Sequence, residues 1–148
     1  MDDNFRPIWQ PTLTSDITAN SSNKTITVPT NFIWLPTSIR IAYSTNATVG
    51  NRQLEVRYET SAGTIFLRKK AKVTQSAELV YDYNFFINSE DAGSVIASIA
   101  STDLYNILPY AELPPGTVIR IIDSSAIAPA GSGENMLIYV NYRGRPWL

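Results

Sequence analysis

Apolar and polar residues alternate with a period of two in several parts of the chain, and the clearest run lies between residues 53 and 59. There Leu54, Val56 and Tyr58 alternate with charged and polar residues. Successive side chains of a strand point to opposite faces of the sheet. The run therefore predicts a β-strand with one face in a core and the other in water.

The next segment predicts the second strand of a hairpin. A turn at residues 61–63 separates the first run from residues 64–73, where apolar and basic residues mix. Short loops of this kind join antiparallel neighbours. Opposite charges are then expected to face one another across the pair, Glu55, Arg57 and Glu59 with Arg68, Lys70 and Lys72.

A rigid turn followed by an apolar run predicts a buried strand later in the chain. Pro114 and Pro115 fix φ and lack backbone donors, so they belong to the turn. Residues 117–123 are rich in valine and isoleucine, which suit a pleated, buried surface. Arg120 is the charge inside this run, and we expect it in solvent, at a subunit contact or paired with a carboxylate. We interpret the run as the penultimate strand.

Further strands are predicted at residues 24–28, 32–43, 77–86, 104–110 and 135–142. Pro36 predicts an edge, a bulge or a corner, and residues 94–101 fit either a short helical face or a loop. About eight strands separated by turn signals predict an all-β protein, a two-sheet antiparallel sandwich. A jelly-roll topology is the preferred prediction, and an immunoglobulin-like order stays open.

Extended arms are predicted on both sides of a single domain. We assign residues 1–22 to an N-terminal arm, residues 23–142 to the β-sandwich and residues 143–148 to a C-terminal tail. Deleting residues 1–12 or 143–148 is expected to leave the fold intact. Aromatic anchors on arms are typical of subunit contacts. The predicted protein contacts are therefore Phe5, Ile8, Trp9, Arg143, Arg145 and Trp147.

The amino-acid composition argues against several classes of function. The 148-residue chain has no histidine and no cysteine, which removes the commonest general base, thiolate nucleophiles and disulfides. We therefore expect a non-enzymatic protein without catalytic residues, cofactor or metal. With 17% charged residues and a net charge of −1, no nucleic-acid partner is expected. The sequence has no leader segment and no long apolar run, so we expect no membrane association and synthesis in a cytoplasm.

Three groups of residues offer alternative functions. A facing pair of carboxylates would suit glycoside hydrolysis, although turn hydrogen bonds explain acidic loop residues more simply. The basic run at residues 68–72 would suit a protein or phosphate contact, or else a solvated strand face. Tyr81 and Tyr83 would suit sugar stacking if exposed and core packing if not. The carboxylates in or near predicted loops are Asp82, Asp91, Asp103, Asp123 and Glu134.

Four segments resemble small virion proteins of tailed bacteriophages: IWQPTLTSDIT at 8–18, KTITVP at 24–29, GNRQLEV at 50–56 and LPPGTVIRIID at 113–123. The resemblance implies an all-β protein on the virus particle. Its nearest functional analogues are the jelly-roll cement, or decoration, proteins. Those proteins sit as trimers on the outer capsid surface and clamp neighbouring major capsid proteins, without catalytic residues.

For this chain the resemblance implies a homotrimer that binds the major capsid protein and stabilises the head. Its place is then the capsid surface of a virion made in a host bacterial cytoplasm. The alternative is a carbohydrate-binding or receptor-binding β-sandwich domain of a phage tail or fibre. A carboxylate-based glycoside hydrolase is the third hypothesis.

Overall fold

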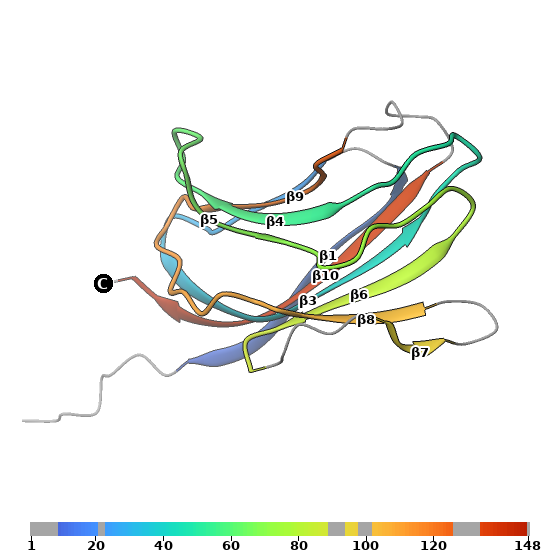
Figure 1. Cartoon of the computed structure of the whole chain (residues 1–148). Helices are drawn as coiled ribbons and strands as arrows, with labels where there is room; N and C mark the ends of the chain where they lie inside the picture. The colour runs from blue at the N-terminus through green and yellow to red at the C-terminus, as the bar shows by residue number, and fades with distance from the viewer. Residues whose placement is uncertain (1–8, 21–22, 89–93, 98–101, 126–133, 148) are drawn as a thin grey trace, which may run out of the picture.

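The computed structural model describes residues 9–20, 23–88, 94–97, 102–125 and 134–147, and the regular elements in this part of the chain are all β-strands (Figure 1). In chain order they are β1 (Gln10–Asn20), β2 (Lys24–Thr27), β3 (Phe32–Ser44), β4 (Leu54–Glu59), β5 (Ile65–Lys70), β6 (Val80–Phe86), β7 (Ser94–Ala97), β8 (Thr102–Ile107), β9 (Val118–Asp123) and β10 (Asn135–Pro146).

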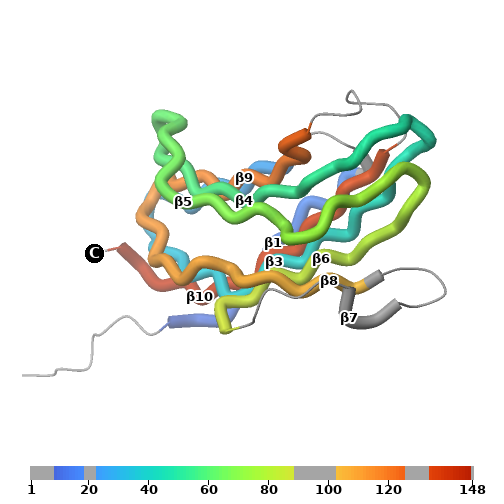
Figure 2. The backbone as a smooth tube through the Cα atoms, in the orientation of Figure 1, coloured from blue at the N-terminus to red at the C-terminus, as the bar shows by residue number. Residues whose placement is uncertain are grey.

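The strands form two sheets that face each other across a common core (Figures 1 and 2). The larger sheet has six strands in the order β1-β10-β3-β6-β8-β7, and the smaller has four in the order β2-β9-β4-β5. Neighbouring strands are antiparallel except β6 and β8, which are parallel. The arrangement confirms the predicted all-β sandwich, which is consistent with a jelly-roll-type fold, although the described residues form ten strands rather than about eight.

The core is built from alternate residues of the central strands. Burying one aliphatic side chain stabilises the fold by about 1.5–3 kcal/mol. The period-two pattern therefore determines which face of each strand turns inward. The inward side chains are Ile39, Ile41 and Tyr43 of β3, Met136, Ile138 and Val140 of β10, Leu54, Val56 and Tyr58 of β4, and Ile119 and Ile121 of β9.

Strand β9 lies in the interior of the smaller sheet, between β2 and β4, as its apolar sequence predicts. Gly116 precedes it with a φ of 80°, a left-handed conformation that glycine adopts without strain. The N–H of Gly116 donates to the carbonyl of Val28 at 2.9 Å, which ties the turn to the end of β2. Arg120 donates its Nε to both carboxylate oxygens of Glu59 at 3.0 Å, one of the three predicted environments.

Residues near both ends of the described chain belong to the larger sheet, which corrects the predicted arms. Residues 10–20 form β1 and pair with β10. Residues 143–146, predicted as a tail, are the end of β10 and pair with β3. The prolines are tolerated because Pro11 lies in an edge strand and Pro146 ends a strand. Residues 1–8 lie outside the described residues.

Two segments whose structure the sequence left open also form β-strands. The register of β3 against β10 shifts between Asn141 and Tyr142, beside Pro36, so this proline marks a bulge, one of the predicted outcomes. Residues 94–97 form the edge strand β7, which is neither the helical face nor the loop that the sequence suggested. Residues 98–101 lie outside the described part of the chain.

A buried polar network closes the end of the sandwich that carries the β3–β4 loop. Arg52 and Glu134 are both buried, and Arg52 Nη2 lies 2.6 Å from Glu134 Oε1. The hydroxyl of Tyr43 donates to Glu134 Oε2 at 2.6 Å. Arg52 also donates to the carbonyl of Gly50 at 2.7 Å and to Asn46 Oδ1 at 3.0 Å. Both charges therefore have the hydrogen bonds that a buried ion pair requires.

Gln75 extends this network across the core. Its backbone exchanges two 2.8 Å hydrogen bonds with Arg52. Its Nε2 donates to the carbonyl of Tyr43 at 2.9 Å, and its Oε1 accepts from the hydroxyl of Tyr83 at 3.1 Å. Desolvation by burial raises the pKa of both tyrosine hydroxyls far above its ordinary value of 10.0, so they remain protonated donors.

Breaking the buried ion pair is expected to destabilise the fold strongly. Glu134→Gln removes the charge that neutralises a fully buried guanidinium, and the loss of one partner of such a pair costs about 3–5 kcal/mol. Urea unfolding followed by circular dichroism measures the change. Asp82→Asn is the control, because it breaks a pair whose Arg40 side chain is 54% exposed, with an expected cost below about 1 kcal/mol. Equal losses in the two variants would contradict the prediction.

Deleting residues 143–148 is expected to destabilise the sandwich, in contrast to the expectation from the sequence. The deletion removes the end of β10, whose residues 143–146 pair with β3. We expect the melting temperature, followed by circular dichroism, to fall by more than about 5 °C. A truncated chain that melts with the full chain would show that this pairing contributes little.

Candidate functional site

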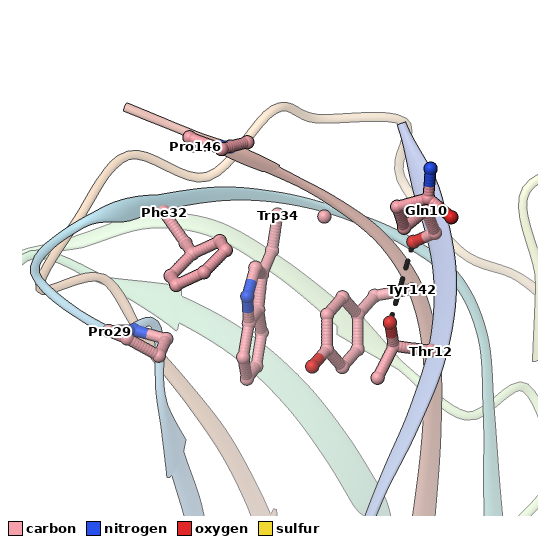
Figure 3. A pocket seen from close by; sticks show the side chains of 8 residues that line it. Gln10, Thr12, Pro29, Phe32, Trp34, Tyr142 and Pro146 are labelled. Carbon is pink, nitrogen blue, oxygen red and sulfur yellow. Dashed lines mark hydrogen bonds between the residues drawn. The ribbon is translucent and has the colours of Figure 1, made fainter. Parts of the chain in front are cut away.

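A cleft of about 280 Å³, which we term the aromatic cleft, opens at the end of β3 that lies opposite the buried polar network. Gln10 aligns with Gly144 in the β1–β10 pair, and Gly144 aligns with Trp34 in the β10–β3 pair. Strand pairing thus brings residues near the two ends of the described chain to one site. The lining residues are Gln10, Thr12, Pro29, Phe32, Trp34, Tyr142, Gly144 and Pro146 (Figure 3).

Two stacked rings form the rigid part of this cleft. The rings of Trp34 and Tyr142 lie with centroids 3.8 Å apart and an interplanar angle of 18°. A Cβ atom on Gly144 would lie 3.2 Å from Tyr142 Cε2 and 3.6 Å from Trp34 Cδ1, so glycine leaves room for the stack. The backbone of Trp34 also exchanges hydrogen bonds with Leu113, at 3.0 and 2.7 Å. The cleft is therefore preformed.

Exposed aromatic side chains lie in and beside the cleft. Phe32, which lines it, is 41% exposed, and Trp147, which follows the lining residue Pro146, is 54% exposed. The N–H of Trp147 donates to the carbonyl of Asn31 at 2.8 Å, which holds the backbone there while the indole stays in water. Large apolar side chains gathered in solvent indicate a binding surface.

Trp9 and Arg145 pack together on the opposite face of the larger sheet. The guanidinium carbon of Arg145 lies 4.9 Å from the centroid of the Trp9 ring, a cation–π contact. Arg143, two residues earlier on the same face of β10, is exposed. Trp9, Arg143, Arg145 and Trp147 thus lie at the end of the sheet that holds the cleft, whereas Phe5 and Ile8 lie outside the described residues.

Sequence reasoning missed the residues that line the cleft. It placed Phe32, Trp34 and Tyr142 on strands, which is correct, but gave them no shared site. The nearby prolines Pro29 and Pro146 were the available signal, because they mark where strands end and aromatic residues become accessible. The register of three strands that are distant in sequence then decides which residues meet.

Three of the five carboxylates considered for hydrolysis have structural roles. Glu134 belongs to the buried polar network. Asp82 accepts a hydrogen bond from Arg40 at 2.9 Å. Asp123 accepts one from the backbone N–H of Ser125 at 2.9 Å, the turn chemistry that its position predicts.

The other two carboxylates do not enter the aromatic cleft. Asp103 aligns with Asp82 on the parallel strands β6 and β8, on the face of the larger sheet that points away from the core. Asp91 lies outside the described residues. Within the described ranges, no group of three or more acidic, histidine or cysteine side chains is placed to hold a metal ion.

Tyr81 and Tyr83 pack in the core rather than on an open face. Tyr83 is fully buried, and Tyr81 packs against the core with its ring centroid 6.1 Å from that of Tyr83. This arrangement confirms the core-packing alternative for the pair. The alternative, in which these two residues form an exposed platform for sugar stacking, is therefore wrong. The described residues contain no helix that is long and apolar enough to cross a membrane.

Comparison with known proteins assigns no family. No family model and no curated protein matches the chain. Among solved structures, the chain is similar to a chain of infectious bursal disease virus, Gx strain, with 10% identity, a TM-score of 0.32 and coverage of 93% of this chain and 41% of that one. The corresponding values for the Gt strain are 11%, 0.26, 99% and 43%. The chain thus spans about two fifths of each viral chain, and at these TM-scores the likeness assigns neither family nor function.

Proposed function

We propose that this chain is a structural protein of a virus particle, a capsid cement (decoration) protein of a tailed bacteriophage. In this proposal a homotrimer binds the major capsid protein on the outer surface of the lattice and stabilises the head. The observation that carries the proposal is the aromatic cleft with the exposed Phe32 and Trp147 beside it. A partner protein would bury this surface.

The cleft has the properties of an anchor for a protein partner. Interface centres are enriched in aromatic residues, and a few well-packed anchors supply most of the binding free energy. A volume of about 280 Å³ lies just below the range of typical small-molecule sites, roughly 300–1,000 Å³. It therefore suits one side chain of a partner protein.

The polar groups support binding over catalysis. Glu134 neutralises Arg52 inside the core, and Glu59 and Asp82 each accept from an arginine. Carboxylates held in this way are not poised as an acid and base pair.

The virion setting is supported by the four segments that resemble small phage virion proteins and by the low charge of the chain. A neutral, stiff sandwich can repeat many times on a symmetric lattice without strong mutual repulsion. Each contact then needs little affinity, because symmetry and multivalency multiply weak contacts.

The number of copies of the chain in purified virus particles tests the proposed virion role. Quantitative mass spectrometry of particles from the producing host is expected to find this chain in a fixed ratio to the major capsid protein, as lattice binding requires. A ratio typical of tail components would reject the cement role and favour the carbohydrate-binding or receptor-binding alternative. Absence from the particles would reject both.

Truncating the exposed aromatic residues is expected to weaken attachment to particles that lack the protein. Phe32→Ala and Trp147→Ala each remove apolar surface worth about 1.5–3 kcal/mol when fully buried, so the affinity measured by co-sedimentation should fall about tenfold or more. Val49→Ala is the matched control, because Val49 is apolar and 90% exposed in the loop at the other end of β3. Equal attachment of all three variants would contradict a role for the cleft.

A further inference from the structure

Three arginine side chains lie in one row across the outward face of the four-stranded sheet. Arg57 of β4 aligns with Arg68 of β5 on one side and with Arg120 of β9 on the other. Val56 and Tyr58 are buried in the core, so Arg57 between them turns outward. Directly opposite residues have Cβ atoms about 4.5–5.5 Å apart. The three arginine residues, which we call the arginine row, therefore occupy neighbouring positions on the outward face of the sheet.

Two buried glutamates hold the row in place. The side chains of Glu55 and Glu59 are 0% and 6% exposed although both lie on the outward face. Arg57 donates its Nε to Glu55, and Arg120 donates its Nε to Glu59. In the part of the chain that the structure describes, the Nη groups of Arg57 and Arg120 make no hydrogen bond. These four donor groups are free for an external acceptor.

The row keeps an excess of positive charge. Lys70 Nζ lies 4.0 Å from Glu55 Oε2, and Arg68 Nη1 lies 4.0 Å from Glu55 Oε1. Four cations thus surround two carboxylates, a local charge of +2 in a chain of net charge −1. Like charges directly opposite one another destabilise a sheet. Arg68 and Lys70 are 61% and 50% exposed, so the excess charge is accessible.

We propose that the arginine row binds a short acidic segment of a partner protein. Guanidinium groups bind carboxylates through two parallel hydrogen bonds, and the free Nη donors provide that geometry. The row spans three strands, roughly 10 Å at the usual strand spacing, which fits one or two carboxylates. Buried Glu55 and Glu59 and the negative net charge disfavour a polyphosphate backbone.

The basic run at residues 68–72 only partly predicts this site. Arg68 and Lys70 turn outward beside Arg57 and Glu55, as expected for the hairpin. Lys69 aligns with Val56 and therefore turns to the inward side. The arginine row comes from three strands, so the signal lies in their register rather than in the run itself.

A titration with a hexaglutamate peptide at an ionic strength of about 0.15 M, where the Debye length is about 8 Å, tests the proposal on the full chain. We expect saturable NMR shifts at the Nε–Hε signals of Arg57, Arg68 and Arg120, and the peptide affinity of Arg68→Thr should fall about tenfold, because a charge-assisted donor is lost. Arg40→Thr is the matched control, since it removes the same charge from a side chain that is 54% exposed on the other sheet. The affinity of this variant should change less than about twofold.

Three outcomes would contradict the proposal. Equal weakening by Arg68→Thr and Arg40→Thr would reduce the effect to net charge, and an absence of shifts would exclude the site. Tighter binding of a single-stranded oligothymidylate than of the peptide would assign the row to nucleic acid. Arg68→Thr should melt no lower than the unmodified chain, because repulsion with Arg57 is relieved. The test uses no virus particle, so its failure leaves the proposed virion role untouched.

Discussion

The pairing of β10 with β1 on one side and β3 on the other is the constraint on which the rest of this structure depends. It places the beginning and the end of the described chain side by side in one sheet. Without it, Gln10, Trp34 and Tyr142 have no reason to share a cleft. The core needs it as well, because β10 carries Met136, Ile138 and Val140 into the centre of the sandwich.

The two ends of the sandwich satisfy different physical requirements. At the β3–β4 end, buried charges must be neutralised and hydrogen-bonded, and Arg52, Glu134 and Tyr43 meet that requirement together. At the other end the groups beside the core are aromatic rings, which carry no such cost and can face a partner or water. The aromatic rings of the cleft can therefore bind a partner without destabilising the fold. The groups of the buried polar network are all used to neutralise and hydrogen-bond one another, so they contribute to stability only.

Local patterns predict much of this fold, and long-range register explains what they miss. Period-two alternation identifies β4, the hairpin turn that follows it identifies β5, and a run rich in valine and isoleucine identifies β9, because these are local properties of the sequence. It does not identify β1, whose few apolar residues, such as Leu13 at 58% exposure, face solvent. The ion pair between Arg52 and Glu134 joins residues in two loops that have no periodicity, so no local pattern reveals it.

The aromatic cleft and the arginine row would contribute to partner binding through different forces, apolar burial at the cleft and electrostatic attraction at the row. Apolar surface buried at the cleft supplies affinity that salt leaves almost unchanged. Charge at the arginine row accelerates encounter and fixes orientation, and salt weakens it. Ionic strength thus separates the two contributions. An attachment that persists at high salt depends on Phe32 and Trp147, and one that fades with salt depends on Arg57 and its neighbours.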